Sequence, residues 1–133
     1  MALQASVAVQ NARLDAIETT VGVSAILRIR TGAAPANCAA ADTGTVLATV
    51  NLPSDWMAAA SSGTKAKSGT WQDASADASG TAAHFRIYDS AGTTCHLQGT
   101  YGTSATDMIG DSVSFTAGQS FTINTFTVTD GNG

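Results

Sequence analysis

The stretch AAHFRIYDSAGTTCHLQGTY, residues 82–101, contains two alternating segments joined by a turn, and it decides the fold class. In the first segment Phe85 and Ile87 fall on one face of an extended chain, and in the second Cys95 and Leu97 can lie opposite them. The intervening DSAG contains residue types typical of a tight turn. The stretch therefore predicts an antiparallel β-hairpin.

Segments upstream of this hairpin show the same period of two. Residues 24–30, SAILRIR, place their apolar side chains on one face, as a half-buried strand does. Residues 45–51, TVLATVN, predict another strand, and the small residues of 31–44 predict a long loop between the two.

The segment LPSDWMAAASSG between these strands and the hairpin predicts a short helix. Pro53 can start the helix, Ser54 can cap it and Gly63 can end it. We expect Trp56 and Met57 to point from this helix into the core.

The C-terminal part predicts a second hairpin, in which Val113 and Phe115 lie opposite Phe121 and Ile123 around AGQ. The apolar parity switches after Asn124, which indicates a bulge or a strand that changes partners. In total we expect about seven strands, without the alternation of strands and helices that a parallel sheet requires. The predicted fold class is all-β: an antiparallel β-sandwich or jelly-roll-like barrel, with an N-terminal α-helix and one short internal helix.

The segment ASVAVQNARLDAIETTVG, residues 5–22, has a helical rhythm instead. Its apolar residues recur at a three-four spacing with Gln10 as a polar interruption, and Gly22 supplies a C-cap. We expect four residues of this stripe to contact a partner: Val7, Leu14, Ile17 and Val21. An isolated helix of this length is marginal in water, so its own domain or a neighbouring subunit must cover the stripe. We therefore divide the chain into a helical anchor, residues 1–22, and a β-sandwich domain, residues 23–133.

The composition restricts the possible partners. The 133 residues suffice for one modest core, 12% of them are charged, and the formal net charge at pH 7 is −4, which disfavours nucleic-acid binding. The chain lacks a cationic start followed by an apolar run, and no stretch approaches a membrane span, so we expect no signal peptide and no membrane partner. We expect cytoplasmic folding with Cys38 and Cys95 as reduced thiols; one bridge between them is the alternative.

Few residues suggest chemistry. His84, Arg86 and His96 share the outward parity of their strands, but Cys95 has the opposite parity, so a polar outer face or subunit contact is favoured over a metal site. No nucleophile elbow, phosphate loop or calcium loop is present. We expect no enzymatic activity, no cofactor and no metal. The two tryptophans could form a sugar-stacking platform, although core positions are favoured.

Several stretches carry a resemblance to known proteins: NARLDAIETTVG, LRIRTG, PANCAAADTGTVLAT, LPSDWMAAASSG, GTWQD and HFRIYDSAGTTCHLQGT. They cover nearly the whole chain, and PANCAAADTGTVLAT with LPSDWM is the most specific part. The chain resembles a family of small structural proteins of tailed bacteriophages.

The resemblance implies a virion component without enzymatic activity, folded in the host bacterial cytoplasm and assembled in many copies. We expect a capsid decoration or cement protein, with the major capsid protein and copies of itself as partners. One alternative is a collar, tail or fibre subunit that assembles through the N-terminal helix, and another is a carbohydrate-binding module. The family implies no catalytic or ligand residue for this chain.

Overall fold

The computed structural model describes residues 3–130, so the outermost residues of the two expected segments, 1–2 and 131–133, lie outside it. Within that range the chain forms one α-helix, α1 (Val7–Val21), and nine β-strands. The strands are β1 (Ile26–Thr31), β2 (Val46–Asn51), β3 (Thr64–Ala66), β4 (Gln72–Asp73), β5 (Gly80–Tyr88), β6 (Cys95–Gly102), β7 (Met108–Gly110), β8 (Ser114–Phe115) and β9 (Phe121–Thr129). The predicted all-β fold with an N-terminal helix is confirmed.

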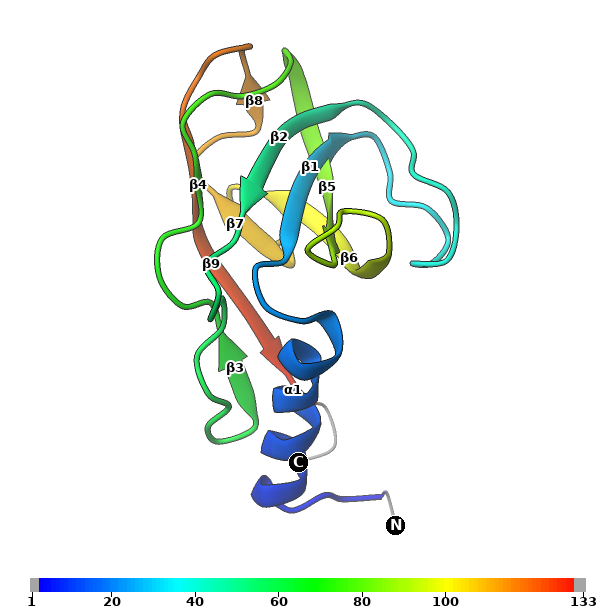
Figure 1. Cartoon of the computed structure of the whole chain (residues 1–133), viewed down its shortest axis with the longest axis vertical. Coiled ribbons are helices and arrows are strands. Elements are labelled where there is room, and N and C mark those ends of the chain that lie inside the picture. Colours follow the sequence, from blue (N-terminus) through cyan, green and yellow to red (C-terminus); the bar gives the residue numbers. More distant parts are fainter. Residues whose placement is uncertain (1–2, 131–133) are drawn as a thin grey trace.

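The strands form one sheet in the order β2-β1-β5-β6-β7-β9-β3, with β4 attached to β9 and β8 attached to β5. Neighbouring strands are antiparallel except β6 and β7, which are parallel. Figure 1 shows the sheet curling around a core at one end of the molecule, while the helix extends away from it. We call this extension the stalk; it comprises α1, residues 58–66 and the end of β9. The N-terminal end of α1 is its tip.

The predicted central hairpin, β5 and β6, is confirmed, but its register is not uniform. Ile87 pairs with Leu97, and the register then shifts so that Tyr88 pairs with Cys95, which leaves His96 as the extra residue. The shift reverses the side on which the following residue lies. Cys95 therefore shares the side of Tyr88, and the expectation that it lies on the side of Ile87 is wrong.

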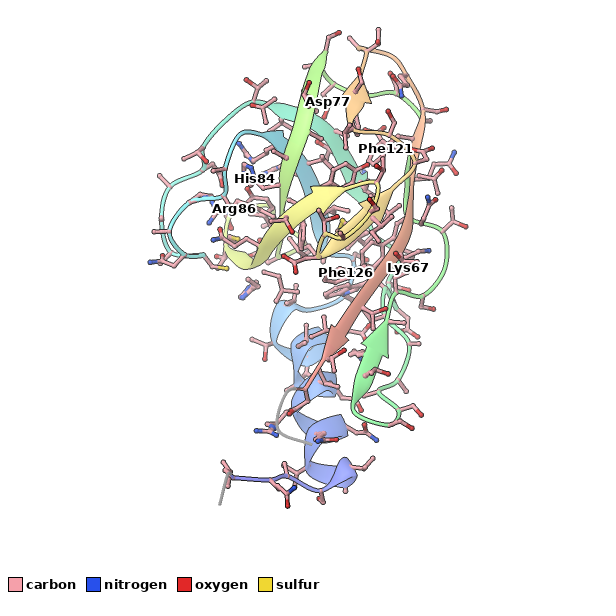
Figure 2. The ribbon with its side chains drawn as sticks, turned by 180° about the vertical axis from the view of Figure 1, so that it is seen from behind. Lys67, Asp77, His84, Arg86, Phe121 and Phe126 are labelled. Carbon is pink, nitrogen blue, oxygen red and sulfur yellow. The ribbon has the colours of Figure 1, made fainter. Side chains whose placement is uncertain are left out.

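Apolar side chains fill the interior that the curled sheet encloses. Leu27 and Ile29 of β1 are fully buried, as the alternation predicts. The ring of Trp71 lies 6.0 Å from that of Trp56 and 5.7 Å from that of Phe126, measured between centroids. Figure 2 shows Phe126 on β9, the long strand that continues from the sheet into the stalk. Both tryptophans are core residues, as the sequence favours.

The short helix expected after Pro53 does not form. Met57 makes an antiparallel bridge to Lys67, and the Ala58 N–H donates to the carbonyl of Ala66 at 2.9 Å. The backbone groups that a helix would use are thus bonded to another segment, which overrides the local capping signal. Met57 is nevertheless buried, as the sequence predicts.

The second predicted hairpin, with Val113 and Phe115 opposite Phe121 and Ile123, is wrong. β8 pairs with β5, where Phe115 lies opposite Gly80. β9 pairs instead with β4 near its start, with β7 in its middle and with β3 near its end. The pairing of β8 is decided by a distant strand, which the pattern around a local turn cannot reveal.

The parity switch at Asn124 is confirmed. Gly110 lies opposite Ile123, whereas Ile109 lies opposite Thr125, so the ladder of β7 and β9 skips Asn124. The strand also changes partners along its length. The bulge and the change of partners, which the sequence leaves as alternatives, both occur.

The helix α1 has defined ends. The Oγ of Ser6 accepts a hydrogen bond from the Val9 N–H at 3.2 Å, and Gly22, with φ of 95°, donates its N–H to the carbonyl of Glu18 at 2.8 Å. In the part of the chain that the structure describes, no helix is long and apolar enough to cross a membrane.

Candidate functional site

The inner side of α1 is held mainly by polar contacts to residues 57–63. Three side chains of the helix accept hydrogen bonds from backbone N–H groups of this segment. The pairs are Glu18 with Met57 at 3.0 Å, Asp15 with Ala60 at 2.9 Å and Asn11 with Gly63 at 3.0 Å. The helix thus satisfies backbone donors of the segment, and each stabilises the other.

A buried ammonium group lies beneath the helix. The side chain of Lys65, on β3, is 1% exposed, and its Nζ lies 2.8 Å from both Asp15 and Glu18 and 2.9 Å from the carbonyl of Ala58. Burial alone would lower the pKa of Lys65, but hydrogen bonds and charges of the two carboxylates raise it above its ordinary value. The hydrogen bond from Lys65 in turn lowers the pKa of Asp15. Lys65 therefore stays charged and ties β3 to α1.

Further contacts hold the C-terminal end and the middle of the helix. The indole N–H of Trp56 donates to the carbonyl of Gly22 at 3.0 Å, and Arg13 forms an ion pair with Asp130 at 2.9 Å. Gln10, the polar interruption of the apolar stripe, is itself 4% exposed. The stalk is therefore a fixed part of the protein.

The four residues expected to bind a partner separate into two groups. Leu14 and Val21 are 4% and 6% exposed, so the chain itself covers them, and they are not available to a partner on this surface. Ile17 is half-buried and packs against the core. Val7 is 54% exposed. The sequence leaves open whether the chain's own domain or a neighbouring subunit covers the apolar stripe. In the structure the chain's own domain covers most of it.

The tip of the stalk is apolar and exposed. Leu3, Val7 and Val9 are 79%, 54% and 49% exposed, and we call these three the tip residues. Among residues 3–130 the other large apolar residue with such exposure is Val23, directly after the helix. Leu3, Val9 and Val23 are not among the contact residues expected from the sequence. The available signal was that Val9 and Val23 are apolar but lie off the buried stripe.

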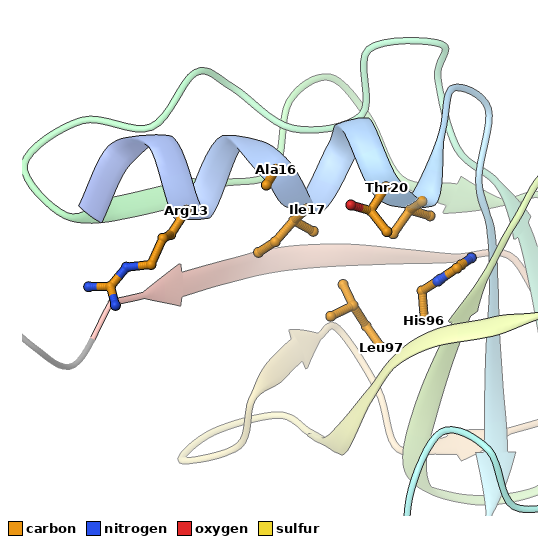
Figure 3. Close-up of a pocket in the computed structure, with 7 residues that line it drawn as sticks. Arg13, Ala16, Ile17, Thr20, His96 and Leu97 are labelled. Atoms are coloured by element: carbon orange, nitrogen blue, oxygen red, sulfur yellow. The ribbon is translucent and has the colours of Figure 1, made fainter. Parts of the chain in front are cut away.

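A shallow groove of about 260 Å³ lies between α1 and β6. Figure 3 shows Ile17 and Leu97 facing each other across it, with Arg13 towards one end and His96 towards the other. The groove can hold an apolar side chain from another molecule.

His96 lines this groove because it is the extra residue of the β5-β6 ladder. It is therefore separated from His84 and Arg86. The cluster of these three residues that shared parity predicts is wrong.

His84 and Arg86 hold the loop of residues 32–44 against the sheet. The ring Nδ1 of His84 is 2.7 Å from the carbonyl of Gly32, and Arg86 donates to the carbonyls of Cys38 at 2.9 Å and Ala40 at 3.2 Å. Both side chains are buried, at 1% exposure. Their outward parity was correctly predicted, but the loop covers that face, so it is not a free polar surface.

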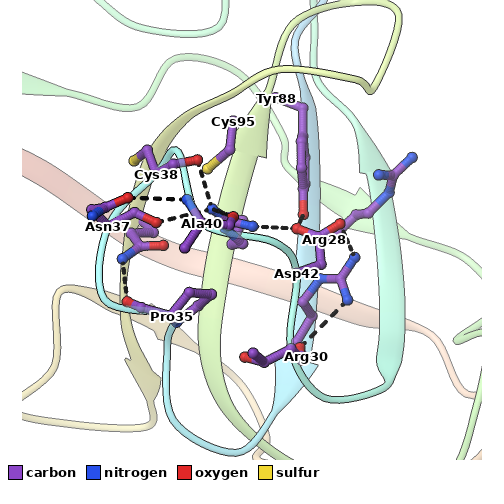
Figure 4. Close-up of polar contacts among 12 residues, drawn as sticks. Arg28, Arg30, Pro35, Asn37, Cys38, Ala40, Asp42, Tyr88 and Cys95 are labelled. Carbon is purple, nitrogen blue, oxygen red and sulfur yellow. Dashed lines mark hydrogen bonds and ion pairs between the residues drawn. The ribbon is translucent and has the colours of Figure 1, made fainter.

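Asp42 completes this arrangement, as Figure 4 shows. Its carboxylate pairs with Arg86, lies 3.1 Å from Arg30 and accepts a hydrogen bond from the hydroxyl of Tyr88 at 2.6 Å. Burial alone would raise the pKa of Asp42, but the hydrogen bonds from Tyr88 and Arg86 and the charges of both arginines lower it. The charged groups of Asp42, Arg86 and Arg30 thus hold the loop of residues 32–44 against the sheet.

Two kinds of site that the sequence disfavours, a metal site and a sugar-stacking platform, have no geometry in the described residues. No group of three His, Cys, Asp or Glu side chains in residues 3–130 is placed to hold a metal ion. Trp56 and Trp71 are fully buried and donate their indole N–H groups to backbone carbonyls, so neither ring is available to stack on a sugar.

Comparison with known proteins yields no match: no family model, no curated protein and no solved structure matches this chain.

Proposed function

We propose that this chain is a structural protein of a tailed-bacteriophage virion and that it decorates the capsid by docking the tip of its stalk on the shell. The sequence resemblance to phage structural proteins supports the first part. The observation that carries the second is the exposure of Val7 and Val9 in the first turn of a fixed, projecting helix, and of Leu3 just before it. Such a tip suits a site that is repeated over a lattice.

The tip residues suit an apolar hollow on the partner. Full burial of an exposed Leu or Val side chain contributes about 1.5–3 kcal/mol, and Val7 and Val9, which are already about half covered, contribute about half of that each. The helix that presents them is already fixed by Lys65 and by the hydrogen bonds to residues 57–63, so docking needs little ordering of the chain. The major capsid protein is the proposed partner, with neighbouring copies of this chain as secondary contacts.

The decoration role is favoured over a collar, tail or fibre subunit by the burial of the helical stripe. A trimeric coiled coil would bury Val7, Leu14, Ile17 and Val21 against other helices. Leu14 and Val21 already lie in the chain's own core, so a bundle built on that stripe would first have to detach α1.

Locating the chain on intact virions tests the proposal. A small label is inserted in the exposed turn at Ser90 and Ala91, which joins β5 to β6, and particles are imaged by electron microscopy. We expect label density at regularly repeated positions on the capsid surface. Label at the collar or tail would instead support the alternative virion role, and its absence from purified particles would overturn the virion proposal.

A further inference from the structure

Cys38 and Cys95 are the two cysteines of the chain, and the fold brings them together. Cys38 belongs to the loop of residues 32–44, and Cys95 begins β6. Both line one pocket of about 550 Å³ beside Arg86 and Tyr88, and Figure 4 shows their sulfur atoms on the same side of the sheet. The Cys95 thiol donates to the carbonyl of Leu97 at 3.3 Å. Burial, together with the neighbouring Cys38 side chain, raises the pKa of Cys95 to about 11.

Two independent features position the thiols. The guanidinium of Arg86 holds the backbone of Cys38 through the carbonyl hydrogen bond at 2.9 Å. The register shift in the hairpin places Cys95 opposite Tyr88, and therefore on the side of the sheet that the loop covers. Without the shift Cys95 would point away from Cys38. The pair is thus a product of both the loop anchor and the bulge.

We propose that Cys38 and Cys95 form an intrachain disulfide when the folded protein meets a disulfide oxidant, and that this bond fastens the loop of residues 32–44 to β6. The Cys38 thiolate attacks one sulfur of the oxidant and displaces one thiolate, which takes up a proton. The Cys95 thiol then loses its proton to solvent and attacks the Cys38 sulfur, which releases the second thiolate. Two electrons and two protons pass from the cysteines to the oxidant.

The cross-link belongs to conditions outside a reducing cytoplasm. In the cytoplasm both thiols stay reduced, and the loop is held by the contacts of Arg86 and Asp42 alone. After oxidation the loop is also held covalently, and the unfolded chain is constrained by a long closed loop. This inference is independent of the proposed virion role, because it depends only on the two thiols and their surroundings.

Oxidation of the purified full-length chain tests the proposal. The reduced protein is incubated in its native state with oxidised glutathione at pH 7 and pH 9 and then analysed by intact mass and by mapping of non-reduced peptides. We expect loss of two hydrogen atoms per chain, a linked peptide containing both cysteines and a monomeric product. The reaction should be faster at pH 9, because little Cys95 is ionised at pH 7. The midpoint of thermal unfolding should rise by roughly 10 °C and return on reduction.

The matched controls are Cys38→Ser and Cys95→Ser, which each keep one thiol. Neither variant should show an oxidant-dependent rise in the unfolding midpoint. Stable glutathione adducts without an internal bond, disulfide-linked dimers, or oxidation that occurs only in denaturant would each overturn the proposal.

Discussion

The two ends of this molecule are held together by different interactions. The curled sheet surrounds an apolar core in which Trp71 and Phe126 are in ring contact and Leu27 is fully buried. The stalk depends much more on polar contacts, with Lys65 between two carboxylates and with helix side chains bonded to the backbone of residues 57–63. Besides its buried apolar residues, a helix can therefore be fixed to a β domain by side chains that satisfy backbone donors that no strand satisfies.

Removing residues 1–22 should have the largest effect. The deletion uncovers residues 57–63, leaves Lys65 without carboxylates and removes Leu14 and Val21, whose burial contributes about 1.5–3 kcal/mol each. The total loss is a large part of the stability of an ordinary domain, about 5–15 kcal/mol. We expect no cooperative thermal transition by circular dichroism. The division into an anchor and a separate β-sandwich domain implies instead that residues 23–133 fold alone, and an unchanged midpoint of the shortened chain would support that division.

Two substitutions on α1 compare its inner and outer sides. Leu14→Ala creates a cavity in a buried position and should lower the free energy of unfolding by about 2–5 kcal/mol. Val7→Ala removes an exposed side chain and should change it by less than about 0.5 kcal/mol. Urea unfolding measures both. Equal effects would mean that the side chain of Leu14 is not buried as described.

The ionic part of the stalk can be tested by removing either the carboxylates or the ammonium group. Asp15→Asn combined with Glu18→Gln leaves a buried charge without a counterion and should lower the unfolding midpoint by several degrees. Lys65→Met removes the charge itself and fills a similar volume, so it should cost less. If Lys65→Met were the more damaging change, attraction between the charges would matter more than burial of an unpaired one.

Acid should weaken the stalk through Asp15. Its pKa is lowered in the folded protein, so its contribution is fully present above the ordinary value of 3.8 and is lost as the pH falls through the folded pKa. The stability of the wild type, measured by urea unfolding from pH 6 to pH 2, should fall more steeply than that of Asp15→Asn, which has no carboxylate there. Parallel curves would show that Asp15 is not linked to folding.

The sequence predicted the features that depend on local period. The alternation in β1, β2 and the central hairpin was correct because successive side chains of a strand point to opposite faces. The prediction of a helix after Pro53 was wrong because backbone groups of that segment form hydrogen bonds to α1 and to residues 64–68. The sequence pattern of the segment contains no information about these distant partners. The partner of β8 was missed because β5 lies far away in the sequence.

The candidate site was predicted less completely. The stripe of Leu14 and Val21 was recognised, but a stripe alone does not say whether the same chain or another one covers it. Val9 was missed because it lies off the stripe. Leu3 continues the spacing of the stripe but precedes the helix, which begins at Val7, and it was not selected as a contact residue. Gln10 was treated as an interruption although it is buried.

Binding of purified protein to phage particles that lack it tests the central claim, that the tip residues dock the protein, most directly. Val7→Asp with Val9→Asp should keep the fold, since acidic residues are favourable in the first turn of a helix. Ser90→Asp with Ala91→Asp adds the same charge in a distant turn as the control. We expect the tip variant to bind at least about 100-fold more weakly than the wild type, and the control to bind normally. Normal occupancy by the tip variant would contradict the account.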